Sequence, residues 1–273
     1  RHRRAHRLPA PIQPLPPMGN SRALRLRVRV ERGRQRARQG ARAVRLYMKY
    51  KRIEEDEIAI DFSNGDHKTP EFLKISPNNR MPAIVDHKNV IDGQPMSVFE
   101  SGAILMYLAE KAENFFPQQS PDRERVLEWL FWQVGGLGPM AGQVSHFVNY
   151  APNFPGDHSY SETRYKNEYD RLLGVMDKVL NEREFLAGDY SIADMASFPW
   201  VTAYKRYEVD LDSFANVRRW FDAVKVRPAV RRGMDVGKEA RNFGEGISKE
   251  SLKTMFKQDA KSISEMAKAK EED

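Results

Sequence analysis

The sequence predicts a small α/β unit followed by a larger all-helical unit, and three observations lead to this prediction. Between about residues 58 and 112, short β-type runs separated by turn residues precede one helical pattern. A Pro-containing stretch over residues 116–121 then indicates a linker. Beyond it, several segments carry apolar residues at helical spacing.

The α/β unit is expected to begin upstream of this region, where apolar residues alternate with arginines over residues 24–30. A period of two predicts a strand with one face in solvent. A second strand is expected over residues 58–62. The remaining elements are a short helix, two strands that flank a turn at Asp92-Gly93, and a closing helix, expected at residues 70–73, 83–85, 96–99 and 101–112.

The helical unit is expected to contain helices at residues 123–136, about 162–181, 192–206 and 214–226. The glycine-rich run 135–139 is expected to break the first of these, and Pro152 and Pro155 are expected to bound a long connection. Ser191, with Asp194 three residues later, predicts a capping box at the start of the helix from residue 192. The Lys-rich tail holds a weak amphipathic stretch around Phe256.

Composition narrows the possible classes of protein. The 273 residues suffice for two modest domains, and 40% hydrophobic residues support a packed core. No apolar run approaches the ~20 residues of a membrane helix, so a soluble protein is expected. The chain has 0 Cys, which excludes disulfides, thiolate metal ligands and a cysteine nucleophile.

Positive charge is concentrated at the N-terminus. Residues 1–45 hold 14 Arg and one acid, Glu31, a net +13 in a chain whose total is +7, so the rest of the chain is mildly acidic. The basicity is therefore local, and it does not predict a nucleic-acid-binding face spread over the fold. Binding of nucleic acid or an acidic surface by this arm alone remains an open alternative.

Two short motifs suit a small peptide-like ligand. A cis bond at Met81-Pro82 would turn the Met81 amide and carbonyl outward to pair with an extended peptide, although a plain turn proline is the alternative. Ser101 is expected to cap the helix through residue 112, whose first-turn amides suit a carboxylate, while Glu100 suits an ammonium. The pair would match an α-amino-acid head group, and a capped helix with a solvated Glu100 is the alternative. His67, in a loop, is a candidate donor to a ligand carboxylate or simply an exposed side chain.

The runs 69–79, 100–105, 129–140 and 185–194 resemble the nu class of glutathione transferases, including its yeast nitrogen-regulator relatives. This resemblance implies the glutathione transferase architecture, an α/β thioredoxin-like N-terminal domain plus an all-α C-terminal helical domain, usually as a homodimer. The corresponding domain boundaries are a disordered basic arm at 1–22, a glutathione-binding domain at 23–113, a helical domain at 122–236 and a tail at 237–273.

The resemblance also implies how glutathione, the co-substrate, is held. Met81 and Pro82 would contact its cysteinyl backbone, and Glu100 and Ser101 would hold its γ-glutamyl group. His67 would lie near the glycyl end. No metal is expected, and the second substrate would be a small electrophile or a disulfide.

Three further residues are less certain members of this site. Arg164 matches an arginine that reaches from the helical domain toward glutathione, with a surface helix arginine as the alternative. His146 and Tyr150 either line the pocket or pack on an apolar face.

The N-terminal segment departs from the family pattern. A Thr-Pro-Asn-Gly turn beside the glutathione sulfur is replaced by residues 37–40, so Gln39 is the remaining candidate donor to a thiolate. Arg25, Arg27 and Arg29 would place charges on a central strand, where unpaired burial is costly. Segment 23–52 is therefore expected either not to form that strand or to belong to a damaged domain. An artefact of the gene model and a mitochondrial targeting segment are further alternatives.

The expected function is a cytoplasmic glutathione-dependent transferase or disulfide-bond oxidoreductase that uses the thiol of bound glutathione, with peroxide reduction as a related reaction. The alternative is a non-catalytic regulatory or chaperone-like relative with an impaired active site, which the missing Thr-Pro-Asn turn favours.

Overall fold

The structure is a computed structural model that describes residues 26–30, 39–51, 53, 55–60, 65–91, 93–236, 256 and 259, with the backbone alone for 26–30 and 55–59. The predicted basic arm at 1–22 lies outside the described residues, as does the tail from 237 apart from residues 256 and 259. Among the helices that are described, none combines the length and the apolar character that a membrane span requires.

Within the described residues, a four-stranded sheet has the order β2-β1-β3-β4. β1 (Leu26–Val30) pairs in parallel with β2 (Glu55–Ala59) and antiparallel with β3 (Ala83–Ile91), and β3 pairs antiparallel with the edge strand β4 (Gln94–Phe99). The arginine-alternating segment is thus a central strand, which excludes the alternative that it does not form one.

The second strand lies further toward the N-terminus than residues 58–62, which were predicted from their apolar side chains. Ile60 is buried, but it lies after the end of β2 and packs in a small cluster with Phe72 and Met81. An apolar side chain can be buried although its backbone is not hydrogen-bonded in the sheet. The alternating apolar residues therefore predicted a strand that runs too far toward the C-terminus.

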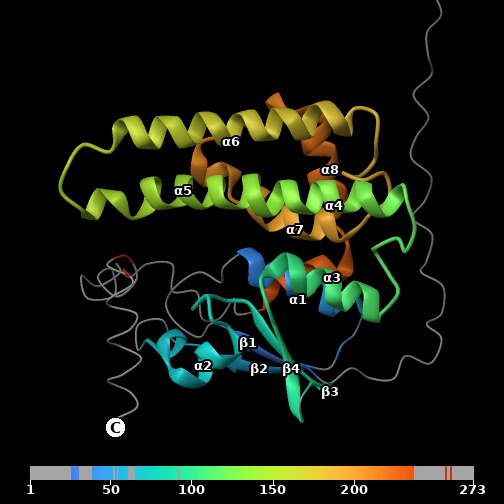
Figure 1. The fold of residues 1–273 in the computed structure, drawn as a ribbon. Helices are drawn as coiled ribbons and strands as arrows, with labels where there is room; N and C mark the ends of the chain where they lie inside the picture. Colours follow the sequence, from blue (N-terminus) through green and yellow to red (C-terminus); the bar gives the residue numbers. More distant parts are fainter. Residues whose placement is uncertain are drawn as a thin grey trace, which may run out of the picture.

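The helices of this unit are α1 (Gln39–Lys51), η1 (Asp66–Lys68), α2 (Pro70–Ile75) and α3 (Ser101–Lys111). In Figure 1, α1 and α3 lie between the sheet and the helical unit. α1 contacts α3, α7 and α9, which explains why it is buried although its sequence has little apolar stripe. Even Arg45 is only 1% exposed, and Arg42 donates to Gln39 Oε1 over 2.9 Å.

The helical unit consists of a series of helices joined by short 3₁₀ and π turns. They are α4 (Asp122–Trp132), η2 (Gln133–Leu137), α5 (Gly138–Asn149), η3 (Ala151–Asn153), α6 (Ser159–Leu180), α7 (Ile192–Val201), η4 (Tyr204–Tyr207), η5 (Leu211–Ser213), α8 (Ala215–Lys225) and α9 (Pro228–Asp235).

The glycine-rich run was predicted to break the first helix, but the chain stays helical through it: α4 is followed by the π turn η2 and then directly by α5, a helix that the sequence analysis missed. Pro139 lies in the first turn of α5, directly after this π turn. A Cβ at Gly138 would lie 2.6 Å from the Gln133 side-chain nitrogen. This glycine therefore allows close packing and does not end a helix.

The predicted helix 192–206 is also too long. α7 ends at Val201, and the chain continues as η4, which the Tyr207 hydroxyl holds by donating to the Ala141 carbonyl over 3.1 Å. The predicted capping box at its other end is confirmed, since Asp194 accepts from the Ser191 N–H at 3.0 Å. α9 was not predicted either.

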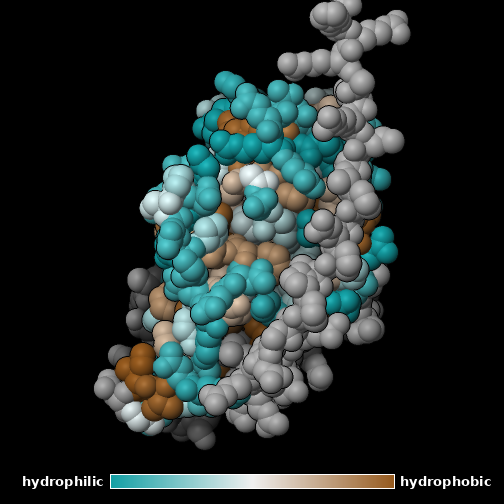
Figure 2. Space-filling view, turned by 90° about the vertical axis from the view of Figure 1, so that its right-hand side faces the viewer, coloured by the Kyte–Doolittle hydropathy of each residue, from teal (hydrophilic) through white to brown (hydrophobic). Residues whose placement is uncertain are grey.

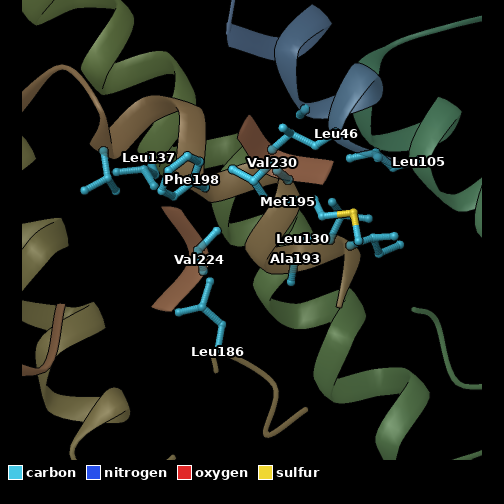
Figure 3. Packing of buried hydrophobic residues seen from close by; sticks show 14 of the residues in the cluster. Leu46, Leu105, Leu130, Leu137, Leu186, Ala193, Met195, Phe198, Val224 and Val230 are labelled. Carbon is cyan, nitrogen blue, oxygen red and sulfur yellow. The ribbon is translucent and has the colours of Figure 1, made fainter. Parts of the chain in front are cut away.

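One hydrophobic core spans both units, with α7 at its centre. Figure 3 shows Leu46 of α1, Leu105 of α3 and Val230 of α9 gathered near Met195 and Phe198 of α7. Because the same cluster buries side chains from the sheet unit and the helical unit, the faces that meet between them are held in one arrangement.

A buried polar contact ties α3 to the sheet. Asp86 of β3 is fully buried and accepts from the Tyr107 hydroxyl at 2.5 Å, from the Lys88 N–H and from the Lys111 ammonium. Burial alone would raise the pKa of Asp86, but these donors hold the pKa below its usual value. The contact fixes α3 on β3, and with it the start of α3 at the edge of the pocket described next.

Candidate functional site

A cavity of about 390 Å³ opens between the two units. One wall comes from the start of α1, the loop before β3 and the start of α3, and the other from α5, α7 and η4. The described lining residues are Gln39, Gly40, Arg80, Met81, Pro82, Glu100, Ser101, Gly142, Ser145, His146, Tyr150, Trp200, Arg206, Tyr207 and Phe256.

The loop before β3 contributes Met81 and Pro82, whose peptide bond is cis. The Ser76 hydroxyl donates to the Arg80 carbonyl over 2.7 Å and so joins the two ends of the segment that leads to Met81. The Met81 side chain is buried with Ile60 and Phe72. The loop is therefore anchored on the side away from the cavity.

Glu100 and Ser101 lie where β4 turns into α3. Glu100 has φ 68 and is the N-cap residue, because its carbonyl accepts the first helical hydrogen bond from the Ile104 N–H at 2.9 Å. The prediction that Ser101 is the cap is wrong by one residue: the turn at Glu100 starts the helix earlier, and Ser101 is its first residue. The Asn78 side chain donates to Glu100 Oε1 over 2.9 Å and orients that carboxylate.

The start of α1 approaches these two segments closely. A Cβ at Gly40 would lie 3.1 Å from Ser101 Oγ and 3.4 Å from Pro82 Cδ. Only a glycine lets the backbone of α1 approach so closely without a shift. The amide oxygen of its neighbour Gln39 accepts from Arg42, so the N–H₂ half of that amide is the part available as a donor.

The opposite wall is aromatic. The Phe256 ring lies 4.8 Å from the His146 ring and 5.0 Å from the Tyr150 ring, measured between centroids. Burial lowers the pKa of His146, with a smaller contribution from the nearby His158. His146 is therefore neutral near pH 7, and this group of rings adds no charge to the wall.

The structure brings most of the predicted site residues together. Gln39, Met81, Pro82, Glu100 and Ser101 all line the cavity, as do His146 and Tyr150.

Two predicted residues lie elsewhere. His67, in η1, is 1% exposed and is not among the lining residues. Arg164, on α6, has a side chain 57% exposed and 3.8 Å from Glu168 in an ion pair. Their roles in glutathione binding stay predictions.

The sequence analysis did not assign a role to several lining residues, among them Arg80, Trp200, Arg206 and Tyr207. No motif marks them. Arg206 lay at the end of a predicted helix, and Phe256 was noted only for its amphipathic surroundings. Among the described residues, no three His, Asp or Glu side chains are grouped as a metal site would require.

Comparison with known families matches both units. The model described as "Glutathione S-transferase, N-terminal domain" matches residues 36–110, and "Glutathione S-transferase, C-terminal domain" matches residues 146–228. The chain belongs to the glutathione transferase family. The Disulfide-bond oxidoreductase YfcG of Escherichia coli (strain K12) is 44% identical over 192 residues, which cover 70% of this chain and 88% of YfcG.

Solved structures of other glutathione transferases have the same fold. One from Pseudomonas putida, with one glutathione disulfide bound per subunit, is 39% identical with a TM-score of 0.70, and the match covers 78% of this chain and 91% of that one. URE2P6 from Phanerochaete chrysosporium, in complex with oxidized glutathione, is 28% identical with a TM-score of 0.70, over 80% and 98% of the two chains. These matches confirm the predicted architecture and the predicted relation to the nu-class and nitrogen-regulator branch.

Proposed function

We propose that this protein binds glutathione in the cavity between its two units and uses the glutathione thiol as a disulfide-bond oxidoreductase, within the broader chemistry of glutathione-dependent transferases. The observation that carries the proposal is the convergence of Gln39, Met81, Glu100 and Ser101 on one cavity. Relatives named as a disulfide-bond oxidoreductase or solved with glutathione disulfide support it.

The γ-glutamyl end of glutathione has an ammonium and a carboxylate on one carbon. Glu100, oriented by Asn78, supplies the negative charge for the ammonium. The hydroxyl of Ser101 and the first-turn amides of α3 supply donors for the carboxylate, since a helix N-terminus favours an anion. Both groups come from consecutive residues, so the head group is bound at one point.

Met81 supports the middle of the tripeptide. Its side chain is packed beneath the loop with Ile60 and Phe72, so we assign its lining of the cavity to its backbone. A backbone amide and carbonyl pair with an extended peptide as a neighbouring strand would. The cysteinyl residue then lies between α3 and the start of α1.

A glutathione thiol with a pKa near ~8.5 is mostly protonated at neutral pH, and a nearby helix N-terminus lowers such a pKa. α1 begins at Gln39 beside the cavity, with no acidic residue in its first turn. Its amides and the Gln39 N–H₂ group are the proposed donors to the thiolate.

The proposed reaction balances with two glutathione molecules. The bound thiolate attacks one sulfur of an acceptor disulfide, a new sulfur–sulfur bond forms, and the other half leaves as a thiolate that takes a proton from water. A second glutathione attacks the glutathione sulfur of this mixed disulfide and releases the second acceptor thiol. Two electrons pass from two glutathiones to the acceptor, which yields glutathione disulfide and two thiols.

Several finer points belong to the same proposal. His67 and Arg164 stay proposed contacts for the glycyl end and the helical side of glutathione. The protein is proposed to be a homodimer and to work in the cytoplasm.

A non-catalytic, regulatory relative is the second candidate function. The observation that favours it is Gln39 in the place of the Thr-Pro-Asn turn, because the hydroxyl and the amide of that turn are both missing. Among the described residues there, the N–H₂ group of Gln39 is the one side-chain donor that takes their place, its amide oxygen being engaged by Arg42. Glutathione binding without turnover of hydroxyethyl disulfide or cumene hydroperoxide would favour this candidate over the oxidoreductase.

Calorimetric titration with glutathione tests the binding site. Ser101→Ala is expected to weaken binding about three- to tenfold, the value of one hydrogen bond. Ser97→Ala, on the exposed face of β4 and outside the cavity, is the matched control and is expected to bind as the wild type does. No heat and no competition at millimolar glutathione would remove the proposal, and an unchanged affinity of Ser101→Ala would remove the role of Ser101.

A further inference from the structure

His146 is a titratable side chain on the helical wall of the cavity. It belongs to α5, and Gly142 and Ser145 of the same helix also line the cavity. A helical side chain leans toward the turn before its own, and for His146 that turn contains Gly142. A Cβ at Gly142 would lie 4.0 Å from the Trp200 ring, so its absence leaves open space beside the imidazole.

The ring of His146 is positioned by aromatic contacts. Its centroid lies 4.8 Å from that of Phe256, 5.2 Å from that of Phe147 and 6.2 Å from that of Tyr150. Within the part of the chain that the structure describes, neither ring nitrogen takes part in a hydrogen bond. A neutral imidazole has one N–H donor and one acceptor nitrogen, so both can serve a molecule bound in the cavity.

The surroundings of His146 favour its neutral form. Burial lowers the pKa of the imidazole, and the charge of nearby His158 lowers it further. The titratable side chains that surround it are Tyr150 on the same helix, His158 and Tyr165 on the side of α6, Arg206 and Tyr207 of η4, and Arg80 and Glu100 on the opposite wall. At pH 7 the imidazole can therefore accept a proton.

The second half of the proposed reaction needs a proton acceptor on this wall. The glutathione that attacks the mixed disulfide arrives mostly as a thiol, because a pKa near ~8.5 leaves only a few per cent of it ionised at pH 7. The first glutathione occupies the wall made by the starts of α1 and α3. The second molecule therefore approaches along the wall made by α5, α7 and η4, where His146 lies.

We propose that His146 transfers the proton of the second glutathione. The inference rests on the proposed function and adds a catalytic residue to the same site. The imidazole accepts the proton of the attacking thiol as its sulfur bonds to the glutathione sulfur of the mixed disulfide, and the bond to the acceptor sulfur breaks. The imidazolium then gives this proton to the departing acceptor thiolate. One sulfur–sulfur bond forms, one breaks, and His146 returns to its neutral form.

The mixed disulfide of glutathione and 2-mercaptoethanol isolates this step, because it is the product of the first attack on hydroxyethyl disulfide. Its reduction by glutathione is measured with the full chain across a pH series, and each rate is corrected for the reaction without protein. His146→Gln is expected to lower kcat/KM for glutathione about tenfold near pH 6.5. The deficit should shrink to about twofold near pH 9, where most of the thiol ionises without a base.

Two further variants sharpen the test. His87→Gln makes the same substitution at an exposed position of β3 outside the cavity lining, and it is expected to keep the wild-type pH profile. His146→Ala should regain activity at neutral pH when free imidazole is added at tens of millimolar, and the wild type should not respond. Calorimetry should show that both His146 variants bind glutathione as the wild type does, since the first molecule is held by the opposite wall.

The possible results distinguish failure of this inference from failure of the proposed function. A deficit of His146→Gln that stays constant with pH, no deficit at all, or no rescue of His146→Ala by imidazole would overturn proton transfer by His146 and leave the oxidoreductase function in place. Lost glutathione binding in these variants would also overturn it, because His146 would then serve binding. A wild-type protein that neither binds glutathione nor reduces the mixed disulfide would remove the proposed function, and the inference with it.

Discussion

At residue scale, the Asp194 carboxylate accepts several hydrogen bonds, yet its burial disfavours the charge that it carries. It is fully buried and accepts from the Leu186 and Ser191 N–H groups and from Trp220 Nε1 at 2.8 Å. Burial raises its pKa to about 6, although these donors act in the opposite direction. The three donors need a hydrogen-bond acceptor at this position, whereas burial favours the neutral form of the carboxyl group.

This raised pKa predicts a pH dependence of stability. Because the folded-state pKa of Asp194 lies above the ordinary aspartate pKa of 3.8, the folded state binds more protons between about pH 4 and pH 6. The contribution of this group to stability therefore falls as pH rises through that window. The difference in unfolding free energy between wild type and Asp194→Asn should shrink by up to about 3 kcal/mol from pH 4 to pH 7.

Urea unfolding at each pH measures this difference, with Asp189→Asn, in the segment just before α7, as the control for loss of one exposed carboxylate. A difference that grows with pH would contradict the assignment.

Glu100 is the other residue in an unusual state. Its backbone φ of 68° is rare for a residue other than glycine, and such conformations concentrate at binding sites. Here the conformation turns the chain from β4 into α3 and places the carboxylate within reach of Asn78. The backbone geometry and the proposed ammonium contact thus depend on the same residue.

At the scale of elements, the start of α1 determines how tightly the thiolate site is built. Gly40→Ala would place a methyl group 3.1 Å from Ser101 Oγ and push α1 away from α3. Alanine favours a helix over glycine by about 1 kcal/mol. This gain offsets the strain of the close contact, so the stability of the protein should change little. We expect glutathione affinity and disulfide turnover to fall about threefold or more, since one hydrogen bond to the ligand would be lengthened.

Titration calorimetry and thermal unfolding of the same variant separate these effects. Gly174→Ala, on α6, is the matched control, because its nearest neighbour would be at 3.9 Å, an ordinary contact. Unchanged glutathione affinity in Gly40→Ala would show that the close approach is not needed for the site.

At the scale of the whole molecule, apolar side chains remain uncovered on the β3–β4 hairpin. Val90 and Ile91 are 55% and 54% exposed, and β4 is the edge of the sheet. Figure 2 shows a compact hydrophobic patch at one end of a largely hydrophilic face. Exposed apolar edges favour pairing with another chain, in keeping with the proposed homodimer.

Light scattering after size exclusion is therefore expected to give about twice the chain mass of 31.5 kDa. Ile91→Lys should shift the protein toward the monomer, because a charge would be buried against the partner. Tyr160→Lys, at a more exposed site on α6, should not. A wild-type monomer at tens of micromolar protein would contradict the prediction.

Much of the chain could be interpreted from its sequence because the relevant signals are local. Alternation predicted β1, and the two short runs on either side of the turn at Asp92-Gly93 predicted β3 and β4. The pair Ser191 and Asp194 predicted a capped helix. The residues around Met81 and Glu100 marked one wall of the cavity. These features depend on neighbours within a few positions, so short patterns suffice to identify them.

Only the tertiary structure determined the rest. That an arginine-rich segment is a central strand follows from its pairing with β2 and β3, and α1 becomes buried because α7 and α9 cover it. The second wall brings Arg206 and Phe256 to Gln39 across most of the chain. No local pattern specifies such a meeting, because it arises from how the hydrophobic core packs the two units against each other.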